Sequence, residues 1–242
     1  MTPLYACHGI GMHSGFFARQ QAALAPRDVI PVNMPGFGTT PFAGAYGFPD
    51  LAQNLADATG DNPAHVIGHS MGGMVALELA ATRPEKIESL ILCNTTPAFG
   101  GKDDTFKKQF VSARLKPLED GKTMAEMAPA SVRAMSAPET SAADVDFMAA
   151  LMAETPEQAY RAAIECLVTF DRRTALEGLS MPVLLIGGED DQAAPAKTMR
   201  RMAEKIPGAE CHILPGGHMT PVEQAVEANR LIADFLSRVE AP

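Results

Sequence analysis

Short apolar runs alternate with stretches of helical spacing along the first part of the chain. The apolar runs are typical of strands, whereas Leu51, Leu55 and Ala58 recur at the spacing of a helix. The predicted strands are residues 2–7, 29–33, 64–68 and 89–93, and the predicted helices are residues 15–24, 48–59 and 71–83. The helix at 71–83 is apolar on nearly every side except at Glu78, so we expect it to be buried. The alternation favours right-handed crossovers and a mainly parallel sheet.

The alternation stops at Pro97 and returns after Met181. Between these points we predict no strand, and the helical stretches are rich in Ala, Met, Glu and Arg. These stretches are residues 103–115, 122–135, 141–154 and 156–170. The last part of the chain predicts strands at 182–187 and 210–214 and helices at 196–206 and 221–239. Thr220, Pro221 and Glu223 mark the start of the last helix as N-cap, first helical residue and third helical residue.

The chain is therefore expected to form a core from residues 1–97 and 181–242, with a helical insertion at residues 98–180. Ligands bind to such folds at the carboxyl ends of the parallel strands. An insertion that leaves the core at one of those ends would cover the binding site. We therefore expect these helices to form a lid, or cap.

Composition limits the kinds of partner. The chain has 242 residues, of which 46% are hydrophobic and 20% are charged, and its formal net charge is −9. These values argue against nucleic acid or an anionic membrane as the main partner, and no apolar run reaches membrane-spanning length. We expect a cytoplasmic monomer or homodimer that acts on a small molecule. The four cysteines lack zinc-binding spacing, and the sequence suggests neither a metal nor an organic cofactor.

The segment Gly68-His69-Ser70-Met71-Gly72-Gly73 lies between a predicted strand and a predicted helix. It fits the G-x-S-x-G pattern of a nucleophile elbow, a sharp turn that exposes a serine hydroxyl beside backbone N–H donors. Such a turn needs glycine where the φ angle is positive or where two backbones approach closely. A chance Gly/Ser turn is the alternative, but the strand before and the helix after it favour the elbow.

A serine nucleophile needs a base, and the base needs an acid that orients it. Among the six histidines, His218 stands on a Gly-rich loop just past the last predicted strand, which is a suitable place for a catalytic imidazole. His13 could line the pocket from a loop position. The other four are expected to brace turns or to be structural or solvent-facing within strands: His8, His69, His65 and His212.

Three adjacent carboxylates, Glu189, Asp190 and Asp191, follow the penultimate strand. By themselves they are also compatible with a solvated turn. Their place in the chain order serine, acid, histidine favours a functional role for one of them. Asn94 follows another strand, where an acid could also stand, but an amide cannot carry the charge.

Five segments together resemble the α/β-hydrolase superfamily over almost the full length of the chain. They are His8–Gly11, Pro35–Gly38, Gly68–Gly73, Gly188–Asp191 with Pro195, and Gly216–His218. The resemblance implies an α/β-hydrolase fold and selects Asp191 as the acid, because the family places it three residues past the glycine and four before the proline. It also implies that the backbone N–H groups of Ile10 and Met71 form the oxyanion hole, which stabilises developing negative charge.

Two features depart from the family pattern. Family members usually have two more strands before the His-Gly strand, whereas only residues 1–7 are available here. We therefore predict a sheet of about six strands, all parallel, with residues 29–33 at an edge. Pro31 agrees with an edge position because proline cannot donate a hydrogen bond to a neighbouring strand. The second departure is Asn33, which stands where the family usually has aspartate.

The predicted activity is hydrolysis of a small carboxylic ester or lactone through an acyl-enzyme on Ser70, with His218 as base and Asp191 as acid. Residues 170–172, leading into 181–183, resemble 3-oxoadipate enol-lactonases and related small esterases and C–C hydrolases with helical caps. A C–C bond hydrolase of the meta-cleavage product type, with the same triad, is the nearest alternative. A small-molecule receptor that keeps the triad is an alternative of another class.

Residues of the insertion are expected to set specificity. Methionine offers adaptable apolar surface, although buried methionine more often only packs helices together. The candidates for substrate contact are His13, Met124, Met127, Met148 and Met152, with Met135 as a further lid methionine. Five arginines could include a clamp for a carboxylate-bearing substrate, although arginine more often lies on a solvated surface. They are Arg114, Arg133, Arg161, Arg172 and Arg173.

Overall fold

A single parallel sheet forms the centre of the computed structural model, which describes residues 1–100 and 104–241. Its strands are β1 (Leu4–Cys7), β2 (Val29–Val32), β3 (Ala64–His69), β4 (Ile87–Cys93), β5 (Val183–Gly188) and β6 (Glu210–Leu214). Their order is β2-β1-β3-β4-β5-β6, and every neighbouring pair is parallel. The prediction of about six parallel strands is confirmed. The edge position of the strand that contains Pro31 is confirmed as well.

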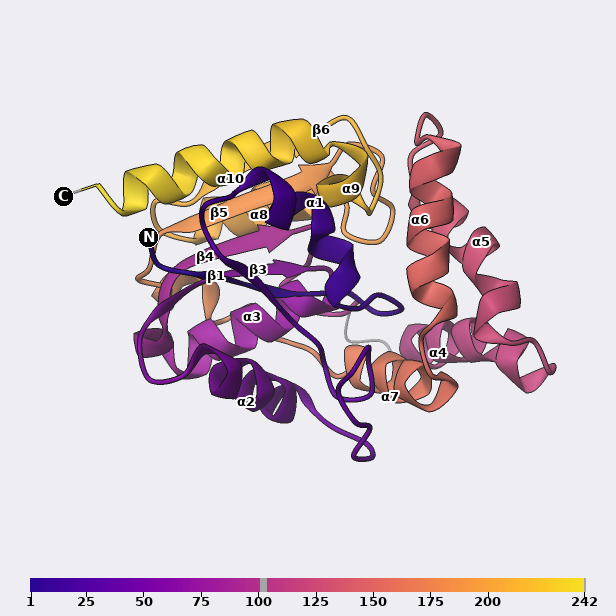
Figure 1. Ribbon diagram of the computed structural model, residues 1–242. Helices are drawn as coiled ribbons and strands as arrows, with labels where there is room; N and C mark the ends of the chain where they lie inside the picture. Colours follow the sequence, from indigo (N-terminus) through magenta and orange to yellow (C-terminus); the bar gives the residue numbers. More distant parts are fainter. Residues whose placement is uncertain (101–103, 242) are drawn as a thin grey trace.

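Helices cover both faces of the sheet (Figure 1). One face carries α1 (Ala18–Ala23), α9 (Thr220–Glu223) and α10 (Ala225–Val239), and the other carries α2 (Phe48–Thr59), α3 (Met71–Thr82) and α8 (Ala196–Lys205). Successive strand residues point to opposite faces, so Val183 and Leu185 join the core on the α3 side, while Leu184 and Ile186 join the core on the α10 side. Three short 3-10 turns complete the fold: η1 (Ser14–Phe17), η2 (Pro84–Lys86) and η3 (Leu176–Gly178).

The α3 helix is buried over most of its length, as predicted. Every residue from Met71 to Ala80 is buried, including Glu78. The Glu78 carboxylate accepts a hydrogen bond of 2.6 Å from Arg172, which supplies the opposite charge that a buried carboxylate needs. The helix that follows Ser70 is thus fixed on all sides.

Between β4 and β5 the described residues form four α-helices, and we call them the inserted helices. They are α4 (Asp104–Glu119), α5 (Met124–Met135), α6 (Ala142–Ala153) and α7 (Glu157–Leu167). They match the four predicted stretches, except that Asp103, the predicted first residue of the first stretch, lies outside the described residues. The inserted helices stand beyond the carboxyl ends of the strands, and the two chain ends lie at the opposite side (Figure 1). Among the described residues, no helix has the length and apolar character needed to cross a membrane.

The prediction of one helix over 221–239 is wrong. The structure has two helices, α9 and α10, separated at Gln224, which has a φ of −123°. Thr220 does not cap the helix, because its hydroxyl donates to Gly217 O at 3.1 Å and accepts from the Asn94 amide at 3.0 Å. The predicted helix at 15–24 is likewise divided, into the 3-10 turn η1 and the short α1.

Candidate active site

Ser70 is the single residue between the end of β3 and the start of α3. Its φ of 53° and ψ of −120° are unfavourable for a residue other than glycine. Two hydrogen bonds hold this conformation: Ser70 N–H donates to Cys93 O at 2.9 Å, and the Thr95 hydroxyl donates to Ser70 O at 2.7 Å. The serine is therefore fixed at the carboxyl end of the sheet.

The glycines around Ser70 are required by close backbone approach. A Cβ atom on Gly68 would lie 2.3 Å from Gly72 O, and one on Gly72 would lie 2.1 Å from Cys7 O. Both distances are far shorter than real Cβ contacts, and the atoms that they would meet are backbone atoms that cannot turn away. The strand-turn-helix context predicted for this motif is therefore present.

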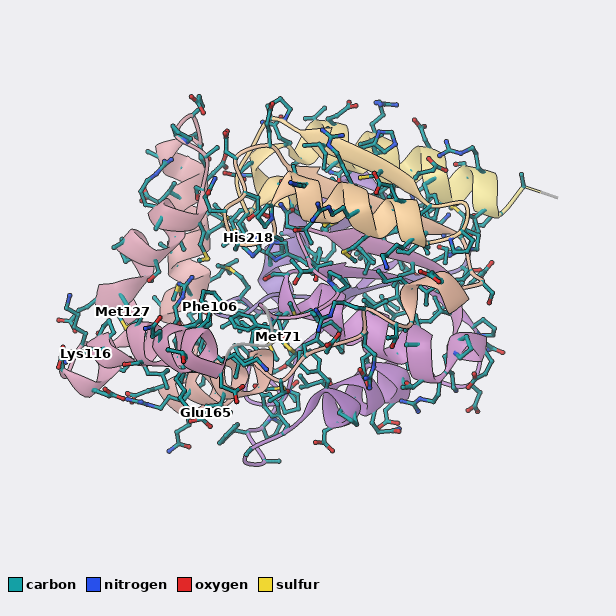
Figure 2. The ribbon with its side chains drawn as sticks, turned by 180° about the vertical axis from the view of Figure 1, so that it is seen from behind. Met71, Phe106, Lys116, Met127, Glu165 and His218 are labelled. Atoms are coloured by element: carbon teal, nitrogen blue, oxygen red, sulfur yellow. The ribbon has the colours of Figure 1, made fainter. Side chains whose placement is uncertain are left out.

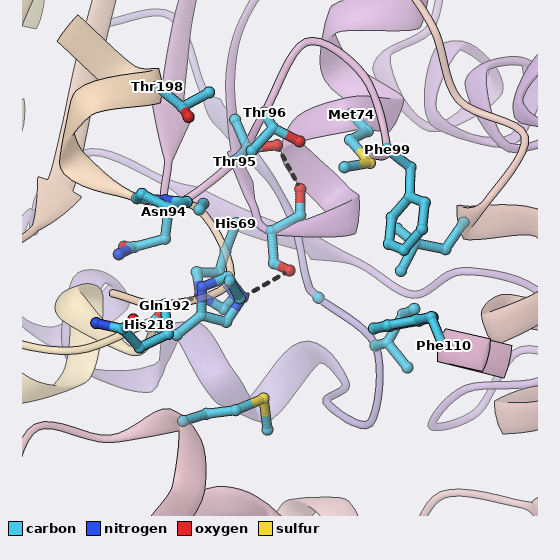
Figure 3. A pocket seen from close by; sticks show the side chains of 18 of the residues that line it. His69, Met74, Asn94, Thr95, Thr96, Phe99, Phe110, Gln192, Thr198 and His218 are labelled. Atoms are coloured by element: carbon cyan, nitrogen blue, oxygen red, sulfur yellow. Dashed lines mark hydrogen bonds between the residues drawn. The ribbon is translucent and has the colours of Figure 1, made fainter. Parts of the chain in front are cut away.

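Three side chains from the ends of three strands form one hydrogen-bond chain. His218 Nε2 lies 2.8 Å from Ser70 Oγ, the contact that a dashed line from the imidazole marks in Figure 3. His218 Nδ1 lies 2.9 Å from Asp191 Oδ2. An ionised carboxylate only accepts hydrogen bonds, so Nδ1 carries the proton and Nε2 can accept from the serine hydroxyl. The structure thus brings together the serine, histidine and aspartate that we predicted from the sequence.

Asp191 is selected from the three adjacent carboxylates by its burial and its donors. Glu189 and Asp190 are exposed, whereas Asp191 is buried. Its Oδ1 accepts from the backbone N–H groups of Ala193 and Ala194, both at 2.8 Å. Burial by itself raises the pKa of Asp191, but the hydrogen bond and charge of the nearby imidazole and the other donors outweigh it and lower the pKa to about 2. The carboxylate is therefore ionised at neutral pH.

Asn94 is a site residue whose role sequence reasoning missed. It is fully buried at the end of β4, with a φ of 48°, and its side-chain amide donates to Asp191 Oδ2 at 3.0 Å. The same amide also donates to Gly217 O at 3.1 Å, in the loop that carries His218. The only signal in the sequence was a polar residue directly after a buried strand.

Two more histidines lie near the site and brace it. His69 Nε2 donates to His218 O at 2.7 Å, and burial lowers the pKa of His69 to about 3. His8 Nδ1 donates to Gly9 O at 2.8 Å, and burial lowers the pKa of His8 to about 4. Both rings are therefore neutral at neutral pH and do not compete with His218 for a proton.

The predicted contact of His13 with the pocket is wrong. Its Nδ1 accepts from Gly15 N–H at 3.2 Å, and its Nε2 lies 3.3 Å from the Glu154 carboxylate. Both ring nitrogens thus face the protein, and His13 is not among the described residues that line the cavity. His65 is buried at a distant site, where it contacts Ser89. No group of three or more His, Cys, Asp and Glu in the described residues could hold a metal ion.

The two predicted oxyanion donors belong to segments that adjoin Ser70. Met71 is the first residue of α3, so its N–H has no acceptor within that helix. Ile10 lines the cavity and follows Gly9, where an added Cβ would lie 3.0 Å from Ser70 Cβ. The turn after β1 therefore packs directly against the serine, with Ile10 beside it.

A cavity of about 1020 Å³ opens at Ser70 and His218. Figure 3 shows His69 and His218 on one side of it and the rings of Phe99 and Phe110 facing them from the other. Further apolar lining comes from the core and the inserted helices, and it includes Met74, Phe106, Met135, Met152, Tyr160, Ile164 and Leu167. The cavity thus places a polar reacting centre next to a largely apolar chamber.

The predicted lid methionines divide into two groups. Met152 lines the cavity, and so does Met135. Met124, Met127 and Met148 are instead buried in the packing of the inserted helices, so their predicted contact with substrate is wrong. Figure 2 shows Met127 away from His218. The three side chains fill the space between helices, which is the common role of buried methionine.

Of the five candidate arginines, Arg114 alone combines a place at the cavity with no carboxylate partner among the described residues. Its guanidinium lies 5.3 Å from the centre of the Phe110 ring. Arg172 pairs with Glu78, Arg161 pairs with Glu157, and Arg133 donates to Thr140 O. Arg173 also lines the cavity but pairs with Asp171.

Comparison with known proteins reveals likeness over most of the chain. A family model described as the alpha/beta hydrolase fold matches residues 2–225. A protein of Variovorax paradoxus named as a carbamate hydrolase, RutD, is 31% identical over 246 residues, which cover 97% of this chain and 91% of that protein. A pimeloyl-(acyl-carrier protein) methyl ester esterase of Aeromonas hydrophila is 31% identical over 227 residues, which cover 90% of this chain and 88% of the esterase.

A solved structure gives the same picture at the level of the fold. The enol-lactonase from Burkholderia xenovorans LB400 superposes with a TM-score of 0.87 at 25% identity. The match covers 98% of this chain and 92% of the lactonase chain. The likeness therefore includes the inserted helices as well as the sheet.

Proposed function

The chain belongs to the alpha/beta hydrolase family and is a hydrolase, and on this premise we propose that it cleaves small carboxylic esters or lactones with Ser70 as nucleophile. The observation that carries the proposal is the hydrogen-bond chain from Ser70 through His218 to Asp191 at the wall of the cavity. The names of two relatives, a methyl ester esterase and an enol-lactonase, support an ester or lactone as the substrate.

In the proposed reaction, Ser70 Oγ attacks the substrate carbonyl carbon while its proton moves to His218 Nε2. The imidazolium that forms is stabilised by Asp191, which the low pKa keeps ionised. The proton on Nε2 then passes to the departing alcohol oxygen, and the acyl group remains on Ser70. Water repeats the sequence: His218 removes a proton from water, the resulting hydroxide attacks the acyl carbon, and Ser70 leaves with that proton.

The N–H groups of Ile10 and Met71 are proposed to bind the oxyanion of both tetrahedral intermediates. The Met71 N–H is free of helix bonding, and the turn before Ile10 packs on the serine. Loss of one such donor typically lowers the rate by a factor of about 100 to 1000. A donor set of this kind favours reactions that pass through an oxyanion.

The inserted helices are proposed to act as a lid that selects the substrate. Met152, Tyr160 and Phe110 contribute apolar surface from these helices to the cavity that Ser70 also lines. The chamber that they form suits an apolar acyl or alcohol group. Arg114 is proposed to bind a negatively charged group at the far end of such a substrate, because it faces the cavity without a carboxylate partner in the described chain.

A substrate panel tests the proposal directly. Purified protein is assayed on esters, lactones, a carbamate, thioesters of graded acyl length and a C–C ring-fission product, each beside the Ser70→Ala variant. We expect turnover of at least one ester or lactone and a loss of several orders of magnitude in Ser70→Ala, with an unchanged melting temperature. Near-normal turnover by Ser70→Ala would contradict the role of Ser70. Turnover of the ring-fission product without any ester would instead favour a C–C hydrolase.

A further inference from the structure

The carboxylate of Glu223 joins the loop that carries His218 to the inserted helices. Its Oε2 accepts from the backbone N–H groups of Gly217 and Met219, at 2.8 and 3.1 Å. Its Oε1 accepts from the backbone N–H of Ala137 at 2.7 Å and from the Thr140 hydroxyl at 2.5 Å. One side chain therefore satisfies four donors, two on either side of the boundary between the core and the insertion.

The two donors on the core side are the immediate neighbours of His218. Their peptide groups determine where the imidazole stands, because His218 has no freedom of its own other than side-chain rotation. The Glu223 carboxylate accepts from both neighbours at once and so restrains the loop. The restraint is strong because hydrogen bonds to a charged group are stronger than those between neutral groups. Glu223 does not reach the reacting atoms, so its effect passes through the position of His218.

The segment on the other side of the boundary also contacts His218 directly. The His218 N–H donates to Met135 O, the last residue of α5, at 2.7 Å. The loop is packed so closely there that a Cβ atom on Gly217 would lie 2.5 Å from Ala137 N. Figure 2 shows His218 at this boundary. The same segment contributes Met135 and Ser136 to the wall of the cavity.

We propose that Glu223 is a positioning residue that makes the placement of the His218 imidazole depend on the seating of the inserted helices. The inference rests on the proposed role of His218 as base. When the segment 135–140 is seated, Oε1 is held by Ala137 and Thr140, which aims Oε2 at the histidine loop. Displacement of that segment breaks these two bonds and the bond from His218 N–H to Met135 O together. Hydrolysis is then fastest when the inserted helices are closed over the substrate.

The near-isosteric variant Glu223→Gln separates this role from simple packing. Whichever way the amide is turned, its NH₂ group faces either the two N–H donors of the histidine loop or the N–H of Ala137, where a carboxylate oxygen accepted before. We expect kcat for an ester substrate to fall about 10- to 100-fold, with KM changed less than about twofold. The rate at which a fluorophosphonate labels Ser70 should fall by a similar factor, because labelling needs the base in place.

Thr140→Val tests the link from the inserted side, since it removes one donor to Oε1 and leaves the histidine loop unchanged. We expect a smaller loss of kcat, and the double variant should lose no more than Glu223→Gln alone, because both changes break the same link. Glu227→Gln is the matched control: its carboxylate binds Arg230 on the exposed face of α10, and kcat should not change.

Three results would overturn the inference. Glu223→Gln could lower the melting temperature while the kcat per folded molecule stays at the wild-type value, which would show a purely structural role. The losses in Glu223→Gln and Thr140→Val could multiply in the double variant, which would show independent effects. Glu223→Gln could alter only KM and leave kcat unchanged, which would show an effect on substrate binding instead of on His218. A wild-type protein that hydrolyses nothing would instead contradict the proposed function and would be recognised in the control assay.

Discussion

Asp191 Oδ2 accepts hydrogen bonds from both His218 Nδ1, at 2.9 Å, and the side-chain amide of Asn94, at 3.0 Å. The amide comes from the end of β4, the strand between those that lead to Ser70 and Asp191. One buried carboxylate oxygen is therefore oriented by the neighbouring strand as well as by the imidazole. This arrangement keeps the acid ionised and directs its second lone pair at His218.

Removal of the Asn94 amide should weaken hydrolysis while leaving substrate binding intact. A hydrogen bond to a charged group contributes about 1.5 to 3 kcal/mol, so we expect kcat to fall about 10- to 100-fold in both Asn94→Gly and Asn94→Ala. The two variants differ in backbone strain: glycine adopts a φ of 48° freely, whereas alanine should lose about a further 1 kcal/mol of stability. Steady-state kinetics and urea denaturation measure the two effects. A wild-type kcat in Asn94→Gly would contradict the role of the amide.

The close approach of β1 to the turn after Ser70 predicts that Gly72 cannot be replaced. The Cβ of Gly72→Ala would lie 2.1 Å from Cys7 O, so either the elbow or the adjacent strand has to move. We expect loss of activity together with a loss of several kcal/mol of stability, measured by urea denaturation. Gly178→Ala is the matched control, because an added Cβ there meets no atom within 4 Å and its stability should hardly change. Equal stabilities of the two variants would contradict the geometry.

Arg114 should control preference for charged substrates. Arg114→Met keeps much of the apolar stem but removes the guanidinium, so we expect the ratio of kcat/KM for a carboxylated ester to that for its neutral analogue to fall about 10-fold or more. Arg161→Met is the control, because Arg161 lies on α7 outside the cavity lining and pairs with Glu157. Comparable rates of the wild-type protein on neutral and carboxylated esters would contradict the proposal that Arg114 binds a negatively charged group of the substrate.

Short sequence patterns predicted the structure correctly where one local requirement of the backbone or of burial determines the residue type. The strand runs, the buried α3 and the Gly-rich turn around Ser70 each follow from a short pattern with one physical cause. The edge position of β2 could be predicted because Pro31 cannot donate a hydrogen bond to a neighbouring strand. The elbow, the carboxylate cluster and the histidine loop were each recognised at a predicted strand end, where the parallel sheet brings them together.

Some features depend on contacts between distant residues that no local pattern marks, and these could not be predicted. Met148 and Met152 are four residues apart and share one face of α6, so periodicity does not show which of them faces the cavity. The predicted helix breaks between α9 and α10, and the expected N-cap at Thr220 is absent. The side chains of Thr220 and Glu223 instead accept hydrogen bonds from residues far away in sequence, Asn94 and Ala137. For Asn94 the sequence showed only a polar residue after a buried strand, because its partner Asp191 is 97 residues away.

A second cluster ties the two ends of the chain together, away from the cavity. The Glu240 carboxylate accepts from Arg27 through both oxygens, at 2.9 and 2.7 Å, and from the N–H of Thr2 at 3.1 Å. It also lies 3.2 Å from Nε2 of the buried His65. The hydrogen bonds from Arg27, followed by those of His65 and Thr2, outweigh desolvation and lower the pKa of Glu240 from 4.5 to about 2.

Glu240→Gln should show that the contribution of this cluster to the free energy of unfolding depends on pH. A lowered pKa means that the folded state holds the ionised form more tightly, so the stabilisation is complete above about pH 4.5 and is lost as the pH falls toward about 2. We expect the variant to lose about 1 to 3 kcal/mol at pH 7 and the gap from wild type to narrow at pH 3, measured by urea denaturation. Glu85→Gln, at an exposed carboxylate, should show no gap at either pH. The cluster lies at the opposite end of the sheet from Ser70, so hydrolysis at pH 7 should be unchanged in both variants. If Glu240→Gln differed from wild type by the same free energy of unfolding at pH 7 and at pH 3, the titration of Glu240 would be contradicted.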